Sequence, residues 1–376
     1  MINDLEGIIV SNASIKAGTK VGTSDILIEV KNSKNYDAYV LIDNYNGRYS
    51  GKNKLVIGSD FYSPFHYGDK FSLSNSISSG ENLKDFLTSY TLPLHKSGLK
   101  AKIEYSRTSY HLIKEYKNLD AHGNSKNILF NLTYAYLRQR YRNLNFFLTV
   151  KKSSLKDEIG IESFINKKQT HTSKIGLNYS KLNNSIFGIA YNLQSNIYFT
   201  VGHLKFDDQT QKNIDKEGAN TSGKYAKVNF SYSSLFQLKE NLSLEVKFNN
   251  QHSLKNKNLD GSEDFLVGGI NAVKIYPSSE LSAENGYVFN TELKYNIFRN
   301  TQVSNSIGVF YDRGKAYAEN SVNRNSRTLQ DIGVGYYLTY KDFFTKLQIV
   351  WKINNERISS EPDNNSKLLF TSGLTF

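Results

Sequence analysis

The feature that most constrains the fold is an alternation of apolar and polar side chains that continues from Tyr36 to Phe376. Successive side chains of a strand point to opposite faces, so the pattern predicts strands with one apolar and one polar face. A soluble sandwich would turn the polar face to water, whereas a membrane barrel would turn the apolar face to lipid. Periodicity alone leaves both folds open. One stretch shows it clearly, with Leu242, Leu244, Val246 and Phe248 on one face and Ser243, Glu245, Lys247 and Asn249 on the other.

The lengths of the connections separate these two folds. Short turns at one end and long loops at the other are typical of outer-membrane barrels. Counting the alternations predicts about sixteen strands, an even number as such barrels require, with both termini and the short turns on the periplasmic side. The short links are 63–68, 94–98, 139–143, 296–300 and 341–343. The long polar ones are 110–126, 156–170, 206–223, 254–286, 319–327 and 354–367.

Composition agrees with a large β-barrel and excludes several other classes. The chain has 376 residues, 26 Tyr and 22 Phe, yet no apolar run approaches the ~20 residues of a membrane helix. It has no cysteine, which excludes a disulfide framework. The net charge of +12 indicates an anionic partner, a lipid surface, a basic lumen or simply a solvated exterior.

No catalytic, cofactor-binding or metal site is expected, because zinc-ligand spacing, a phosphate loop and a nucleophile elbow are all missing from the sequence. The chain is therefore predicted not to be an enzyme and not to bind nucleic acid. A barrel enzyme built on His203 with Asp207 and Asp208 is the weakest alternative.

The end of the chain points to membrane insertion. Residues 368, 370, 372, 374 and 376 share one largely apolar face, and the chain ends on Phe376. This ending is similar to the signal that bacterial outer-membrane proteins present to the barrel-assembly machinery. Phe376 is therefore the expected insertion signal.

Residues 264–277, DFLVGGINAVKIYP, carry packing and pairing groups that an ordinary surface loop would not need. They resemble the conserved loop of the two-partner secretion transporters, the TpsB family that includes ShlB, FhaC and HecB. Four further segments agree. Residues 308–314 are similar to the F-x-D strand motif of the family, 43–51 to its first hairpin, 63–69 to its first periplasmic turn and 22–30 to the end of its second POTRA domain. The loop residues that carry the resemblance are Gly268, Gly269, Val273, Lys274, Ile275 and Tyr276.

This resemblance implies an all-β protein, a sixteen-stranded antiparallel transmembrane barrel over 36–376, preceded by a partial α+β POTRA segment over 1–35. It implies export of a large haemolysin- or adhesin-type exoprotein across the bacterial outer membrane. It also implies that loop 254–286 folds into the lumen, where Lys274 pairs with Asp312 beside Phe310.

The loop departs from the family at two positions, where the family has arginine followed by glycine. Lys274 is a flexible point charge and lacks the two-pronged geometry of arginine. Ile275 is expected to resist the positive φ that glycine tolerates. A weaker anchor is the expected consequence of both changes.

Two rival functions share this fold prediction, a BamA-like assembly factor and a passive porin with an anion-preferring lumen. Residues 1–35 contain no signal peptide, so an N-terminally truncated family member is expected, with these residues in the periplasm. Expected partners are the exoprotein, outer-membrane lipid, and lipopolysaccharide near Lys151-Lys152 and Lys167-Lys168. The barrel itself is expected to be a monomer.

Overall fold

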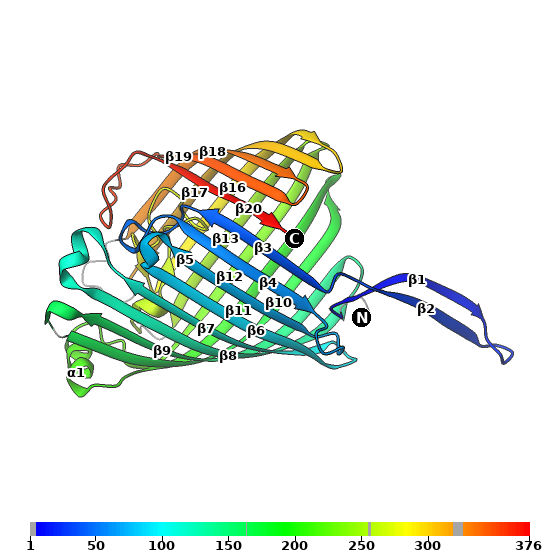
Figure 1. The fold of residues 1–376 in the computed structure, drawn as a ribbon, viewed down its shortest axis with the longest axis horizontal. Coiled ribbons are helices and arrows are strands. Elements are labelled where there is room, and N and C mark those ends of the chain that lie inside the picture. The colour runs from blue at the N-terminus through cyan, green and yellow to red at the C-terminus, as the bar shows by residue number, and fades with distance from the viewer. Residues whose placement is uncertain (1–4, 163, 255–256, 319–325) are drawn as a thin grey trace.

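The computed structural model describes residues 5–162, 164–254, 257–318 and 326–376, and within them sixteen strands form a closed antiparallel barrel (Figure 1). Each strand pairs with the next one along the chain, and the last strand closes on the first. The predicted barrel and its strand number are therefore confirmed. The strands are β3 (Tyr36–Asp43), β4 (Lys54–Tyr62), β5 (Lys70–Ser78), β6 (Leu83–His95), β7 (Leu99–His111), β8 (Ala121–Arg138), β9 (Arg142–Ile159), β10 (Phe164–Ile186), β11 (Ile189–Phe206), β12 (Gly223–Lys239), β13 (Leu242–Leu254), β16 (Asn285–Arg299), β17 (Val303–Tyr317), β18 (Arg327–Tyr340), β19 (Phe343–Lys352) and β20 (Ser366–Thr375).

Short turns and long loops lie at opposite ends of the barrel, as expected. Two predicted loops are nevertheless wrong in extent, because much of 110–126 and nearly all of 156–170 is strand, with Lys156 opposite Lys167 in register. Strands that continue beyond the lipid are polar on both faces, so their composition resembles that of a loop. The connections at the long-loop end hold short 3₁₀ turns at Arg48–Ser50, Ser79–Glu81, Lys114–Leu119, Gly160–Glu162 and Gly261–Glu263.

The loop between β11 and β12, predicted as a long polar connection, contains a helix, α1 (Gln209–Glu217). Asp208 caps this helix, since its carboxylate accepts a hydrogen bond from the backbone N–H of Gln211 at 3.0 Å. None of the helices in the described part of the chain is long and apolar enough to cross a membrane.

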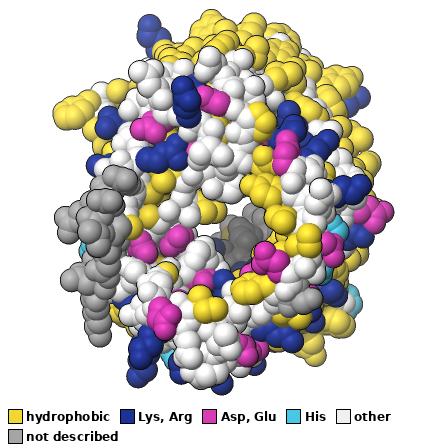
Figure 2. Space-filling model, turned by 90° about the vertical axis from the view of Figure 1, so that its left-hand side faces the viewer, with side chains coloured by type: hydrophobic (Ala, Val, Ile, Leu, Met, Phe, Trp, Pro, Cys, Tyr) yellow, Lys and Arg dark blue, Asp and Glu magenta, His cyan; other side chains and the backbone are white. Residues whose placement is uncertain are grey.

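The apolar faces of the strands point outward and the other faces point into the barrel. On β19, Leu347, Ile349 and Trp351 are 43%, 42% and 40% exposed, whereas the intervening Gln348 and Val350 are 1% and 0% exposed. Hydrophobic side chains cover much of the outer surface in Figure 2, while charged and other polar groups surround the opening. This arrangement matches lipid outside and a mixed lumen inside.

The barrel closes where β20 meets β3, along 371–375 and 39–43. Asn44 prolongs this ladder with its side chain, donating to the carbonyl of Leu368 at 2.9 Å and accepting the N–H of Phe370 at 2.9 Å. The terminal Phe376 pairs with Ala38 through its backbone, and its side chain is 55% exposed on the outer face.

Before the barrel, β1 (Ile8–Ala17) and β2 (Ser24–Asn32) form a hairpin that projects from the end where both termini lie (Figure 1).

The direction of the side chains predicts a strong difference between two substitutions on β17. Val309 lies in the middle of the strand and is 52% exposed on the lipid face, whereas Ser304 faces the lumen. Val309→Arg should lower the free energy of unfolding by about 2–4 kcal/mol, because a charge near the bilayer centre is poorly solvated. Ser304→Arg, the matched control, should change it little. Denaturant unfolding in lipid vesicles measures both, and equal losses would contradict the assignment of the faces.

Candidate functional site

The described loop residues 257–284, called here the inward loop, leave the barrel between β13 and β16 and turn back into the lumen. These strands are the eleventh and twelfth of the barrel. Inside the loop, β14 (Phe265–Leu266) pairs with β15 (Ser282–Ala283) to form a small hairpin base. The part between these strands, 267–281, is called the second arm, and the part before them, 257–264, the first arm.

The second arm carries an apolar cluster that packs against the barrel wall. Val267, Val273 and Tyr276 are 0% exposed and Ile275 is 1% exposed. Burying side chains of this kind contributes roughly 1.5–3 kcal/mol each, so packing is a major force that holds the arm. The residues that receive it, from β16 to β20 and the loop before β20, are Val288, Phe310, Ala316, Leu329, Val350, Ile358 and Leu369.

The two glycines let the second arm fold back on itself. A Cβ atom at Gly268 would lie 2.0 Å from the carbonyl oxygen of Pro277, so only glycine fits at this close approach. Gly269 has a φ of +103°, which side-chain-bearing residues rarely adopt. Gly268 also forms a bridge with Val273, and the Gly269 N–H donates to the carbonyl of Tyr276 at 2.9 Å.

Lys274 reaches the wall at the centre of this cluster. Its Nζ lies 2.6 Å from Oδ2 of Asp312 and 4.4 Å from the ring centroid of Phe310. The Asp312 carboxylate is 0% exposed and the Lys274 side chain 12% exposed, so the pair is largely withdrawn from water. The ring face adds a cation–π attraction to the ion pair. Phe310 and Asp312 are the two outer residues of the expected F-x-D motif.

Two further wall residues complete the anchor, and sequence reasoning missed both. Asn290 donates to Oδ1 of Asp312 at 2.7 Å and to the carbonyl of Ala272 at 2.8 Å. Asp331 lies opposite Asp312 in register and accepts the backbone N–H of Ile275 at 2.8 Å. Asn290 thus binds Oδ1 of Asp312, so Lys274 needs to bind only Oδ2 for both carboxylate oxygens to have a donor.

The replacement of glycine by Ile275 causes no backbone strain here. Ile275 does not have a positive φ, and Gly269 supplies the left-handed turn of this segment instead. The side chain of Ile275 is buried in the apolar cluster, and its N–H faces Asp331. The signal for Asp331 was present in the sequence, because it shares the inward phase of β18 with Leu329 and Gly333. A Cβ atom at Gly333 would lie 2.3 Å from the Phe310 ring, so this glycine makes room for the ring under Lys274.

The far end of the second arm is fastened to the loop before β20. The Glu280 carboxylate accepts hydrogen bonds from the N–H and hydroxyl groups of Ser359 and Ser360 and pairs with Arg327 at 2.9 Å. Burial opposes the charge of Glu280, but the hydrogen bonds from the two serines and the Arg327 guanidinium outweigh it and lower its pKa. Tyr276 adds a bond from its hydroxyl to Asn354 at 2.9 Å.

The inward loop leaves part of the lumen open. Figure 2 shows an opening at the end that bears the long loops. A cavity of about 1080 Å³ lies there between Ile275 and Pro277 of the loop and the connection 44–53. The lumen is therefore narrowed on the side of β16–β20, while the side of β3–β7 is less filled.

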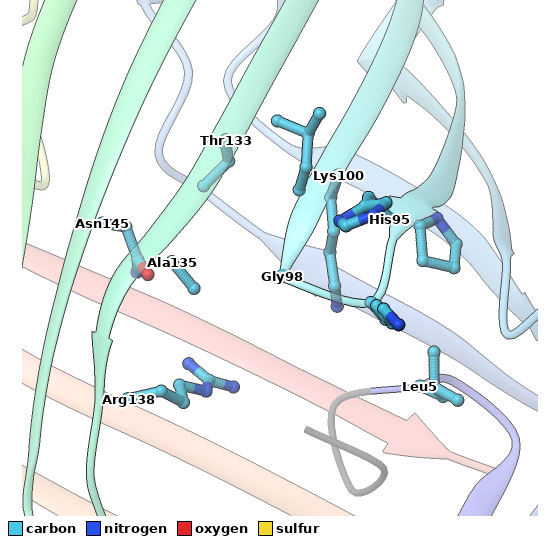
Figure 3. Close-up of a pocket in the computed structure, with 11 residues that line it drawn as sticks. Leu5, His95, Gly98, Lys100, Thr133, Ala135, Arg138 and Asn145 are labelled. Atoms are coloured by element: carbon cyan, nitrogen blue, oxygen red, sulfur yellow. The ribbon is translucent and has the colours of Figure 1, made fainter.

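A second hollow, of about 320 Å³, lies at the periplasmic end, where His95, Lys100 and Arg138 surround it together with Leu5 (Figure 3). It lies between the turn that joins β6 to β7 and the end of β8, and Lys96 is a further basic residue in its lining. This mouth of the barrel is therefore basic.

Lys151 and Lys168 do not lie where sequence reasoning placed them. Both point into the lumen, and Lys168 Nζ lies 2.8 Å from Asp260 of the first arm. Their expected contact with lipopolysaccharide is therefore wrong, whereas Lys152 and Lys167 do point outward. In the described part of the chain no cluster of three His, Asp or Glu side chains has the geometry of a metal site.

A closed sixteen-stranded barrel with an apolar outer face and a loop fastened inside its lumen defines a class, the outer-membrane β-barrels with an inward-folded loop. Residues 22–338 match the family described as haemolysin secretion/activation protein ShlB/FhaC/HecB. The chain belongs to this family, and its place is the outer membrane.

Individual relatives agree with the family. The heme/hemopexin transporter protein HuxB of Haemophilus influenzae is 25% identical over 347 residues, which cover 91% of this chain and 60% of that protein. The chain thus spans about 60% of the length of the curated relatives that it matches. The structure of CdiB from Escherichia coli superposes with a TM-score of 0.85 at 17% identity, covering 100% of this chain and 69% of CdiB. BamA from Haemophilus ducreyi gives 0.64 at 13% identity over 98% of this chain and 76% of its own.

The docking of the inward loop should depend on pH. Burial raises the pKa of Asp264 to about 7, and the charge of Glu284 adds to the shift. The docked loop therefore favours the protonated carboxyl, and docking should weaken as pH rises from the ordinary carboxyl value of ~4 to about 7. Glu280 has a lowered pKa, so its contribution is lost only at more acidic pH.

Hydrogen exchange of residues 257–284 measures this effect. After correction for the intrinsic rates, amides of the loop should be less protected at pH 8 than at pH 5. Asp264→Asn should remove the difference, because the side chain no longer titrates. Equal protection at the two pH values in the unmodified protein would contradict the assignment.

Proposed function

We propose that this protein exports a large exoprotein, of the haemolysin or adhesin type, through its lumen, and that the inward loop is the gate. Membership of the secretion/activation family supports export. The observation that carries the gating role is the second arm, whose apolar cluster and buried ion pair fasten it to the wall.

A passive porin is the less suitable candidate. A channel for small anions requires charged groups along an open, water-filled path and has no use for an apolar core inside its lumen. Here Val267, Val273 and Tyr276 are 0% exposed within the barrel. A loop that packs in this way has two defined states, docked and released, as a gate requires.

A BamA-like assembly factor is the second rival. The likeness to BamA rests on fold alone at 13% identity, whereas the family match covers residues 22–338. Export is therefore the better-supported function. The two differ in one observable, because an exporter releases a folded exoprotein at the cell surface and an assembly factor leaves new barrels in the membrane.

We infer that the β1–β2 hairpin belongs to a POTRA domain that receives the exoprotein in the periplasm. Ile15, Ile26, Ile28 and Val30 share one face of this hairpin and are 42–74% exposed. An apolar face of this size suits packing against the other elements of such a domain. The basic mouth in Figure 3 lies next to Leu5, so a chain delivered by this domain would meet it first.

The remaining partners are proposals of the same kind. Phe376 is proposed as the signal for the barrel-assembly machinery, with its side chain displayed on the outer face. Lys152 and Lys167 are the proposed contacts with lipopolysaccharide. The protein is proposed to act as a monomer, since the lumen of one closed barrel contains the whole gate.

Removal of either partner of the wall anchor should impair export. Lys274→Ala leaves the buried Asp312 without its cation, and Asp312→Ala leaves Lys274 without its anion. Breaking a buried pair in this way costs about 3–5 kcal/mol, enough to shift the loop away from its docked position. The gate then lacks the docked state to which it returns between exported chains, and export falls although the lumen opens more often. Surface display of a co-expressed exoprotein that the unmodified protein exports measures the effect, and both variants should display at least tenfold less.

Lys274→Arg should keep most of the export, because arginine can also pair with Asp312. Lys341→Ala, in a periplasmic turn, is the matched control and should export normally. Normal export by both anchor variants would contradict the proposal. Salt-dependent conductance without any export would favour the porin instead.

A further inference from the structure

The first arm of the inward loop lies on a different sector of the wall from the second arm. It contacts β9, β10 and β12, which are separated from the acidic strands β17 and β18 by β13 and β16. The two arms of the loop therefore contact the barrel wall on opposite sides of β13 and β16, the strands that the loop connects.

Relative to the second arm, the contacts of the first arm with the wall have the opposite distribution of charge. In the second arm the loop supplies the cation and the wall supplies two carboxylates. In the first arm the loop supplies the carboxylates of Asp260 and Glu263, and the wall supplies lysines. The lysine pocket consists of Lys151 on β9, Lys168 on β10 and Lys227 on β12.

The geometry of the lysine pocket is that of a built site. Nζ of Lys227 lies 2.9 Å from the Glu263 carboxylate and 2.6 Å from the Glu263 carbonyl oxygen, and both side chains are less than 9% exposed. Lys168 lies 2.8 Å from Asp260, with the two side chains 14% and 11% exposed, and Lys151 lies 4.0 Å from Glu263. Gln251 adds a bond to the same Glu263 carbonyl at 3.0 Å.

The wall around the lysine pocket is lined with hydroxyl groups that do not hold the arm. Ser153, Thr172 and Thr200 are 4%, 2% and 0% exposed, and among the described residues their hydroxyls have no hydrogen-bond partner.

The ion pairs of Asp260 and Glu263 are the charged attachment of the first arm to the barrel strands. Lys257 and Asn258 add hydrogen bonds to backbone carbonyls of the loop before β12. The charged contacts with the strands can open together as a unit.

We propose that the lysine pocket is a carboxylate-binding site and forms a second lock of the gate, occupied at rest by Asp260 and Glu263. The proposal rests on the gating role of the inward loop. The first lock is the pair of Lys274 and Asp312, which holds the second arm. Release of the second arm alone leaves the first arm across the lumen, so opening requires both locks to break. Glu263 and Lys227 are positioning residues in this account and touch no exported chain.

Conductance of the purified barrel in a planar bilayer tests the second lock without any exoprotein. Glu263→Gln and Lys227→Met should each raise the open probability at least fivefold. The double variant should open no more than Lys227→Met alone, because Lys227→Met already removes every contact of Lys227 with Glu263. Combined with Lys274→Ala, Glu263→Gln should multiply the increase, because the two locks are separate. Glu240→Gln, in the periplasmic turn between β12 and β13, is the matched control.

A labelling experiment identifies which arm has moved. The chain contains no cysteine, so Thr172→Cys, beside Lys151 in register, introduces a single thiol on the wall at the lysine pocket. Glu263→Gln should speed labelling of this thiol by a soluble maleimide at least fivefold. The same maleimide should label a thiol from Leu329→Cys, beneath the second arm, at an unchanged rate in the Glu263→Gln background. Heat-modifiable electrophoretic mobility shows that each variant is folded.

The outcomes are distinguishable. If Lys274→Ala opens the barrel and Glu263→Gln neither opens it nor exposes the thiol at 172, the second lock is refuted and the gate stands. If neither substitution changes conductance or labelling, the gating role itself fails and the lock fails with it. If Glu263→Gln and Lys227→Met add their effects in the double variant, the pair is not the lock and the proposal is overturned.

Discussion

The buried pair of Lys274 and Asp312 is the interaction on which the interior of this barrel depends. Asp312 lies opposite Asp331 on neighbouring strands, and both carboxylates are fully buried. Two buried acids side by side repel one another unless donors surround them. The inward loop brings those donors, the ammonium of Lys274 and the N–H of Ile275. The wall thus lacks two of its donors without the loop.

This mutual dependence explains why an apolar segment is stable inside a lumen. The core of the second arm is formed by the loop and the wall together, in the way that two elements of a soluble domain share a core. Tyr276 and Phe310 come from opposite sides of this contact. Packing supplies most of the attraction, and the charged groups fix the register, since each donor has one matching acceptor. A gate built in this way opens by exchanging one packed state for another.

Much of the fold could be predicted from the sequence, and the reason is physical. A closed barrel with lipid outside and a polar lumen requires apolar and polar residues to alternate on every strand. The positions of the sixteen strands can therefore be recognised in the sequence. The motif residues of the loop and Asp312 could be predicted through family resemblance. The extent of β8, β9 and β10 could not, because strands beyond the lipid lose the apolar face that identifies them.

The missing parts of the site have a common cause. Contacts between segments far apart in the chain define the roles of Asn290, Asp331, Glu280 and Glu263. Alternation predicts which face of a strand a residue occupies, but it does not predict which residue it will contact. Lys168 illustrates the point, since the sequence suggested a loop flank, whereas the strand phase turns its side chain to Asp260 in the lumen.

A covalent link between the loop and the wall tests most directly whether the loop must leave the wall during export. A Cβ atom at Gly314 on β17 would lie 2.4 Å from Cγ1 of Val267 in the loop, a separation that a disulfide can bridge after small adjustment. In the variant Val267→Cys/Gly314→Cys, export should stop when the thiols are oxidised and return after reduction. Gly314→Cys alone should export equally under both conditions. Undiminished export with the disulfide fully formed would contradict a gate that must leave the wall.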